Sequence, residues 1–256
     1  MFSRLRARYI LLRPGETTFE AAGLVDSNPI NKGIKERGLT DKGREQVLQS
    51  AQALKAAGVD PTVFFDNGAR AIQSADILSR ELQIPRNRME PEFRWLEARG
   101  LGALDGTDLR KASLQMRALD AVEMDSQAPQ SEDGTPADSV NDVFSRLRNT
   151  VAKIENTYGS GDFVIIAGDS TVLSVFACAA CGVDLREHSR FELPPGGFYD
   201  LRALRREWQE GRFTEPPPFL GGTDDEVRRG RDALREYGSA LFSETAAGAD
   251  ILGVRR

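Results

Sequence analysis

Histidine and cysteine are scarce in this chain. His188 is the only histidine among the 256 residues, so chemistry that needs two imidazole groups in one site is excluded. The two cysteines, Cys178 and Cys181, are three positions apart in an apolar segment, and this low count excludes a secreted scaffold held together by disulfides. Their spacing is also that of a redox pair, but on a helix of small residues two thiols are more typical of apolar packing.

Long hydrophobic runs and one-signed charge are missing as well. No stretch approaches the roughly 20 apolar residues that cross a bilayer, and the N-terminus lacks the layout of a signal peptide. The 34 basic and 39 acidic residues are scattered, with no basic stripe. We therefore expect no membrane span and no nucleic-acid partner. The expected location is intracellular, by default cytoplasmic, and an organelle stroma stays open if a targeting segment was removed.

Strand and helix patterns alternate along the chain. The apolar run Tyr9–Leu12 stops at Arg13-Pro14-Gly15, as a strand buried on both faces would. Short apolar runs predict further strands at 62–65, 163–167 and 198–201, and helical periodicity predicts helices at 40–57, 71–82, 138–158 and 172–181. This alternation predicts an α/β protein with three αβα layers and a mainly parallel sheet.

Two regions depart from this alternation. Residues 99–136 are rich in Gly, Asp, Ser, Gln and Pro around one amphipathic piece at 109–124, and we expect them to form an excursion from the sheet. Glu215-Pro216-Pro217-Pro218 interrupts the chain before a charged helix at 223–242. We expect one α/β domain over residues 1–205, with residues 206–256 forming a linker and a helix packed on that domain.

Six segments carry a resemblance to a known family. In chain order they are Arg13–Thr17, Leu39–Gln46, Arg70–Ala75, Leu101–Gly106, Gly134–Pro136 and Val164–Ser170. They resemble the histidine phosphatase (phosphoglycerate mutase-like) superfamily. Its motifs in this order are Arg-His-Gly-Glu, Leu-Thr-x-x-Gly-x-x-Gln, Arg-Ala-x-Gln-Thr-Ala, aromatic-Gly-x-x-acid-Gly, Gly-Glu-Ser and a strand ending in Ser-His-Gly. The resemblance covers roughly residues 9–201 and implies a phosphoglycerate mutase-like fold.

The resemblance also implies a mechanism for which this chain lacks the groups. In the family a histidine of the first motif attacks phosphorus, while arginines and a second histidine bind the phosphate oxygens. Pro14 stands at the first position and offers no nucleophile, no base and no N–H. The second histidine's position falls on Gly168 or Asp169, and that of the general-acid glutamate falls on Ala98, one residue from Glu97. We expect no catalytic residue of the family mechanism.

The phosphate-binding part of the family pattern is retained. Arg13 and Arg70 match the two arginines that clasp phosphate in the family, and Gly15 would let the backbone approach a ligand. Three further residues are accessory candidates: Glu16, Glu97 and Asp169. We expect no metal site and no cofactor.

Each of these residues also has a purely structural interpretation. A buried arginine needs a partner, so the arginines can instead pair with carboxylates such as Glu16, Asp66 or Asp169. Asp169 also suits the N-cap of the following helix. His188 lies in a polar stretch and is interpreted as a surface histidine.

Three functional hypotheses follow. The first is a non-catalytic binding or scaffold protein that recognises a phosphorylated small molecule or protein through Arg13 and Arg70. The second is a phosphomonoesterase that replaces histidine with a metal-bound water or a carboxylate near Glu16 and Asp169. The third is a structural subunit of a larger assembly, with residues 223–242 as its contact element. The sequence leaves the oligomeric state open.

Overall fold

A five-stranded sheet forms the centre of the molecule, which the computed structural model describes over residues 2 and 5–242. The strand order is β3-β2-β4-β1-β5. The strands are β1 (Arg8–Leu12), β2 (Thr62–Asp66), β3 (Met89–Glu92), β4 (Asp162–Ile166) and β5 (Phe198–Asp200). Because β5 runs antiparallel to β1 while the other pairs are parallel, the sheet is mixed and mostly parallel.

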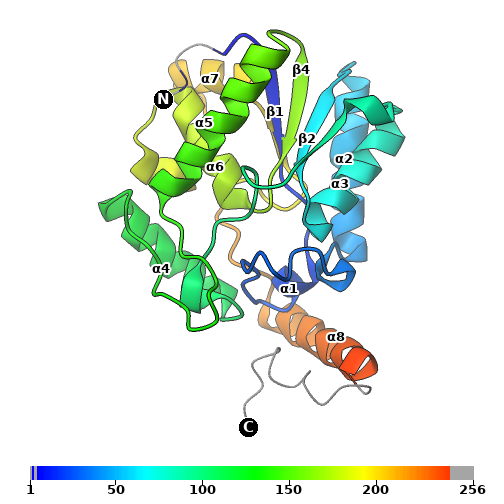
Figure 1. The fold of residues 1–256 in the computed structure, drawn as a ribbon, viewed down its shortest axis with the longest axis vertical. Coiled ribbons are helices and arrows are strands. Elements are labelled where there is room, and N and C mark those ends of the chain that lie inside the picture. The colour runs from blue at the N-terminus through cyan, green and yellow to red at the C-terminus, as the bar shows by residue number, and fades with distance from the viewer. Residues whose placement is uncertain (1, 3–4, 243–256) are drawn as a thin grey trace.

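Helices cover both faces of this sheet (Figure 1). They are α1 (Thr18–Ala21), α2 (Asp41–Ala56), α3 (Ala69–Leu82), α4 (Leu109–Val122), α5 (Val140–Thr157), α6 (Ser170–Cys181), α7 (Leu201–Gln209) and α8 (Asp224–Phe242). Short 3-10 turns lie at Lys35–Arg37, Arg86–Arg88, Gly102–Leu104 and Leu185–Phe191. Helices α2 and α3 pack on one face, and α5, α6 and α7 pack on the other. The predicted α/β fold with three layers is confirmed.

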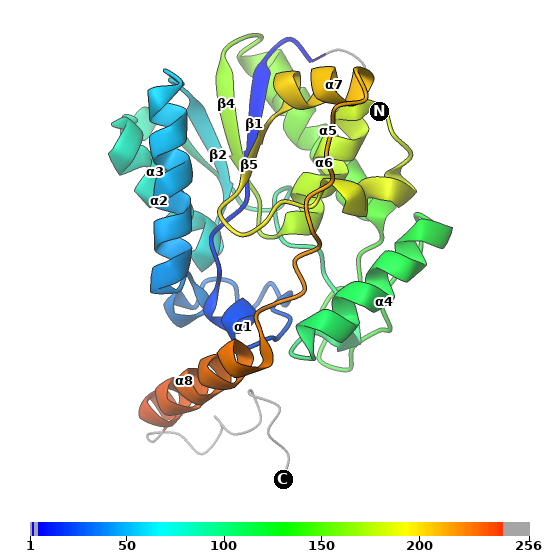
Figure 2. The ribbon, with the colours of Figure 1, turned by 180° about the vertical axis from the view of Figure 1, so that it is seen from behind.

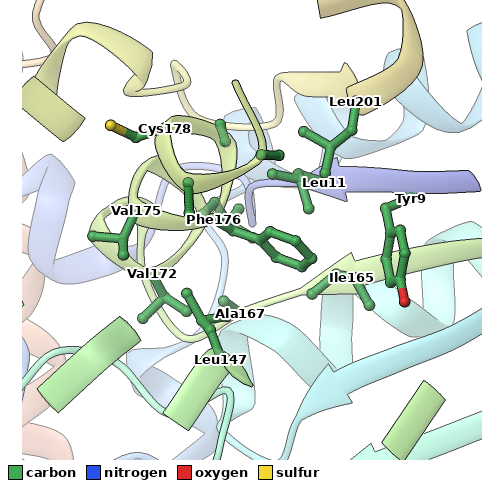
Figure 3. Packing of buried hydrophobic residues seen from close by; sticks show 14 of the residues in the cluster. Tyr9, Leu11, Leu147, Ile165, Ala167, Val172, Val175, Phe176, Cys178 and Leu201 are labelled. Carbon is green, nitrogen blue, oxygen red and sulfur yellow. The ribbon is translucent and has the colours of Figure 1, made fainter. Parts of the chain in front are cut away.

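The central strands send alternate side chains into two separate cores. Tyr9 and Leu11 of β1 pack with α5 and α6, whereas Ile10 and Leu12 pack with α2 and α3. Figure 3 shows Phe176 of α6 pointing toward Tyr9, with ring centroids 5.5 Å apart. Cys178 is fully buried in the same cluster, which confirms apolar packing of this thiol. A strand buried on both faces explains the unbroken apolar run that the sequence shows.

Capping residues set the helix boundaries. Thr40 Oγ1 accepts a hydrogen bond from the Gly43 backbone N–H at 2.9 Å and starts α2. Gly182, at φ 75°, ends α6 in the left-handed conformation. The helices and strands predicted above agree with the structure within two residues at each end. No pattern predicts β3, because its sequence Met-Glu-Pro-Glu contains a proline and two charges and pairs only at the sheet edge.

Helices α1, α4 and α8 lie together at one end of the molecule (Figures 1 and 2). Figure 2 shows the chain running from α7 along the molecule to α8. Helix α8 packs so closely on α1 that a β-carbon added to Gly230 would lie 2.3 Å from the Ala21 carbonyl oxygen.

The domain boundary expected at residue 205 falls inside α7. Within the described residues, no helix has the length and apolar character needed to traverse a bilayer.

Candidate functional site

A polar pocket lies at the carboxyl end of the parallel strands. Its wall brings together Arg13 after β1, Arg70 in the first turn of α3 and Asp169 before α6. The cavity measures about 110 Å³. The carboxyl ends of neighbouring parallel strands form a crevice of this kind, so the strand order places three sequence-predicted site residues side by side.

Arg13 is enclosed by protein groups. Its side chain is 5% exposed, and Nη2 donates to Glu20 Oε1 at 2.6 Å while Nη1 donates to the Leu193 carbonyl oxygen. The Phe219 ring centroid lies 4.7 Å from the guanidinium carbon. Glu20 is itself fixed, because its Oε2 accepts from the Thr17 backbone N–H at 2.8 Å. Arg13 therefore pairs with a carboxylate, but with Glu20 rather than with any carboxylate expected from the sequence.

Arg70 pairs with Asp26, which also binds Arg37. Arg70 Nη2 donates to Asp26 Oδ2 at 2.6 Å and to its carbonyl oxygen at 2.8 Å, while Arg37 Nη1 donates to Oδ1 at 2.6 Å. Burial alone would lower the pKa of Arg70, but Asp26 and the neighbouring carboxylates raise it above its ordinary value. Within the described part of the chain Arg70 donates through Nη2 alone, which leaves Nε and Nη1 for a ligand.

His188 is buried, so the prediction of a surface histidine is wrong. It is 2% exposed, with Nε2 at 3.1 Å from Asp120 Oδ2 and Nδ1 at 2.9 Å from Ser174 Oγ. Arg99 donates to both Asp120 oxygens, at 2.6 and 2.9 Å. Burial would raise the pKa of Asp120, but the hydrogen bonds from His188 and Arg99 hold it below its ordinary value. The polar sequence around His188 predicts exposure, but α4 packs over the 3-10 turn Leu185–Phe191 and buries the histidine.

Asp169 caps α6, as one interpretation predicted. Its Oδ1 accepts from the Val172 backbone N–H and its Oδ2 from that of Arg99, both at 3.0 Å. Gly168 has no room for a larger residue, because a β-carbon there would lie 2.3 Å from the Ala98 nitrogen. Of the two positions considered for a second histidine, Asp169 is therefore the one that can present a side chain.

Gly15 and Glu16 lie outside the wall of this pocket. A β-carbon on Gly15 would lie 1.9 Å from the Gly43 carbonyl oxygen, so the glycine permits close packing on α2 rather than approach of a ligand. Glu16 Oε2 accepts from Lys42 Nζ at 3.0 Å on the same helix. Pro14 is buried between Arg13 and Gly15. Neither Gly15 nor Glu16 lines this pocket, and their expected roles stay predictions.

A smaller chamber adjoins the pocket and shares the walls formed by Asp26 and Arg70. In it, Lys32 forms ion pairs with Glu97 and, at 3.5 Å, with Asp66 Oδ1. Burial raises the pKa of Asp66 above its ordinary value. Glu97, an accessory candidate from the sequence, therefore faces the site through Lys32, while Ala98 lines the same chamber.

A family model of the histidine phosphatase superfamily (branch 1) matches residues 9–215. The chain belongs to the histidine phosphatase superfamily. A search of curated proteins gave no match.

Solved structures of a hydrolase and of phosphatases share the fold of this histidine phosphatase superfamily member at low sequence identity. "Mycobacterial hydrolase 1" has a TM-score of 0.59 at 18% identity, covering 75% of this chain and 89% of the other. A mycobacterial glucosyl-3-phosphoglycerate phosphatase complexed with VO3 has a TM-score of 0.58 at 15% identity, covering 75% and 90%. An alpha-ribazole phosphatase from Shigella flexneri has a TM-score of 0.54 at 18% identity, covering 75% and 88%.

In this superfamily member, the sequence patterns predict few of the residues that form ion pairs in the site. Thr17 and Glu20 do fit a capping box, which indicates a fixed Glu20. Asp26 and Lys32 lie in an irregular loop, and Asp120 lies in the excursion, where no periodic pattern assigns a partner.

The charges on the wall of the histidine phosphatase pocket compensate one another, with four arginines beside five carboxylates. Four arginines line it, and each has a carboxylate partner: Arg13 with Glu20, Arg70 with Asp26, Arg99 with Asp120 and Arg117 with Glu192. No group of three or more His, Cys, Asp or Glu in residues 2 and 5–242 is arranged to hold a metal ion. The arrangement suits an anion that competes with, or joins, these carboxylates.

Proposed function

We propose that this histidine phosphatase superfamily member binds a phosphorylated ligand in the arginine pocket without forming a phosphohistidine. The observation that carries the proposal is that Arg13 and Arg70 line one cavity. The residue next to Arg13 is Pro14, which has no nucleophilic atom. Positively charged guanidinium groups at fixed positions recognise phosphate oxygens whether or not a nucleophile is present.

Two features support a bound anion. Arg70 makes no hydrogen bond through Nε or Nη1 to a described residue, so each of these N–H groups can donate separately to an oxygen of an anion. Ser170 and Thr171 of the first turn of α6 also line the pocket, and the backbone N–H groups of a first helical turn attract negative charge. A mycobacterial phosphatase of the same fold forms a complex with VO3, an oxyanion.

The two groups of the pocket that most resemble a substitute for the missing imidazole, His188 and Asp169, are both engaged. His188 has both ring nitrogens engaged, one with Asp120 and one with Ser174. Asp169 has both oxygens engaged by backbone N–H groups, so its carboxylate is fixed as a cap rather than free to act as a base. These contacts favour binding over the alternative of a carboxylate-assisted phosphomonoesterase. Phosphorylated small molecules and phosphorylated proteins are both compatible with the pocket.

Calorimetry with inorganic phosphate tests the proposal. The wild-type protein is expected to bind phosphate in the millimolar range, and Arg70→Ala is expected to weaken binding at least about tenfold because it removes the free donors. Arg80→Ala is the matched control, because Arg80 lies on the same helix, is 78% exposed and is paired with Asp76. Wild-type protein that binds no phosphate, or equal binding by Arg70→Ala, would overturn the proposal.

A further inference from the structure

A groove lies where α8 meets α1, the 3-10 turn Lys35–Arg37 and the start of α2. Figure 2 shows α8 and α1 next to each other at this end of the molecule. The groove measures about 400 Å³, and small-molecule sites in proteins measure roughly 300–1,000 Å³. Among the described residues it shares none of its wall with the arginine pocket, so it is a separate cavity.

The α8 wall of this groove is held in place by contacts with α1 and α2. Gly230 brings the backbone of α8 against the Ala21 carbonyl oxygen of α1. Arg231 Nε donates to the carbonyl oxygen of the next residue, Ala22, at 2.9 Å. Lys42 Nζ of α2 lies 4.0 Å from Glu226 Oε1 of α8. These contacts give the groove a defined shape.

The greater part of the groove is apolar. Ala21 of α1 and Leu39, a buried residue before α2, form one side, and Ala233 and Leu234 of α8 form the other. Thr18 also lines the groove, but its Oγ1 already donates to a backbone carbonyl oxygen at 2.8 Å. A ligand that buries a hydrocarbon chain against these walls removes apolar surface from water on both sides.

Three charged side chains line the same groove: Lys35, Glu36 and Arg44. Lys35 and Arg44 are exposed and form no ion pair with a described residue. Arg44 Nη2 donates to the neutral Gln73 Oε1 at 3.2 Å. Glu36 supplies one negative charge to the wall, so the two cations exceed the carboxylate by one charge. An apolar surface beside two cations complements an anion that carries a hydrocarbon chain.

The groove is too short for a helix of a partner protein. Helix α8 borders it over Gly230–Leu234, which is about 6 Å along the helix axis. A helix bound in a groove uses apolar side chains at positions i, i+4 and i+7, and these extend over about 10 Å. A small molecule therefore fits the groove better than a helical peptide does.

We propose that this groove binds a free alkyl carboxylate of medium chain length. The chain lies against Ala21, Leu39 and Ala233, and the carboxylate is bound by Lys35 and Arg44. This site is additional to the arginine pocket and does not depend on the proposed function.

Calorimetry with octanoate tests the proposal, with butanoate and octylammonium as matched probes. We expect wild-type protein to bind octanoate at least about tenfold more tightly than butanoate, because four more methylene groups leave water. We expect it to bind octanoate at least about fivefold more tightly than octylammonium, which has the same chain length and the opposite charge. The double variant Lys35→Gln/Arg44→Gln should lose the preference for the anion and keep the preference for the longer chain.

Two further variants locate the bound molecule. Ala233→Trp places a large ring in the groove from an exposed position of α8 and should weaken octanoate binding at least about tenfold. Arg228→Gln is the matched control on the same helix, because Arg228 is 73% exposed and paired with Asp225, and it should bind octanoate as wild type does. Arg70→Ala should also bind octanoate as wild type does, because Arg70 lines the other cavity.

The proposal is overturned if wild-type protein binds no octanoate or binds octanoate and octylammonium equally. Octanoate binding that persists in Ala233→Trp would overturn it as well. Loss of octanoate binding in Arg70→Ala would place the molecule in the arginine pocket and contradict the assignment. A wild-type protein that is dimeric by size-exclusion chromatography and binds no octanoate would indicate a second copy of the chain in the groove instead.

Discussion

Arg70 Nη2 lies 2.6 Å from Asp26 Oδ2, and the two side chains are only 12% and 3% exposed. This pair places a negative charge from the protein beside the donors that a phosphate would use. Arg13 and Glu20 repeat the arrangement in the same pocket. On the proposed function, a phosphate would compete with these internal carboxylates, and single substitutions would change the strength of that competition.

Asp26→Asn should strengthen phosphate binding. The substitution removes the charge that opposes an incoming anion and leaves an amide oxygen that can still accept from Arg70, so phosphate affinity is expected to rise about tenfold. The same change should lower the free energy of unfolding by about 1–3 kcal/mol, because two buried arginines lose their counter-charge. Calorimetry and urea denaturation measure the two effects. Unchanged phosphate affinity in a folded variant would speak against competition at Arg70.

Glu20→Gln should act in the same direction at Arg13. It removes the carboxylate that holds Arg13 Nη2 and weakens the capping box of α1, for an expected stability loss of about 1 kcal/mol. Phosphate affinity should rise severalfold, measured by calorimetry. Glu45→Gln, at an exposed position of α2, is the control and should change neither quantity. A Glu20→Gln protein with weaker phosphate binding would show that Glu20 assists the anion rather than opposing it.

Periodicity predicted the fold because nearly every long element buries an apolar face. The run Tyr9–Leu12 and the stripe of α5 both follow directly from side-chain direction in a strand or a helix. Short elements without such a face, such as β3, were not predictable, because Pro91 and its glutamates pair only at the sheet edge.

The site likewise contains residues that the sequence predicts and residues that it does not. Arg13, Arg70 and Asp169 could be brought together from the sequence because each lies within four residues of the carboxyl end of a strand that the sequence reveals. Their partners could not be. Asp26 comes from an irregular loop, and the capping box fixes Glu20 in α1 without indicating that it pairs with Arg13. His188 was misjudged for the same reason, since its burial depends on Asp120 and Arg99, both distant in sequence.

His188→Ala tests the burial of this histidine. Loss of the ring leaves Asp120 and Ser174 each without one hydrogen-bond partner and opens a cavity, so we expect the free energy of unfolding to fall by about 2 kcal/mol or more. A solvated histidine would change it by no more than about 0.5 kcal/mol. Urea denaturation at neutral pH distinguishes the two values. Phosphate affinity should stay close to that of wild type, because Arg70 makes no contact with His188 among the described residues.

The cysteines should be unreactive in the native protein. Burial raises the pKa of Cys178 to about 12 and that of Cys181 to about 11. The thiolate is the reactive form and a raised pKa keeps the thiol protonated, so alkylation at pH 8 should be at least about 100-fold slower than in denatured protein. The rate should increase as the pH rises toward these pKa values. Mass spectrometry after iodoacetamide treatment follows the reaction, and rapid labelling of folded protein would contradict the raised pKa values of the two thiols.

The most direct test of the account is the rate of phosphate release from p-nitrophenyl phosphate by pure wild-type protein, with and without magnesium. The account predicts a rate equal to that of the Arg70→Ala variant and to the background without protein, because Pro14 supplies no nucleophile and His188 is engaged on both nitrogens. Turnover by the wild-type protein that disappears in Arg70→Ala would contradict it.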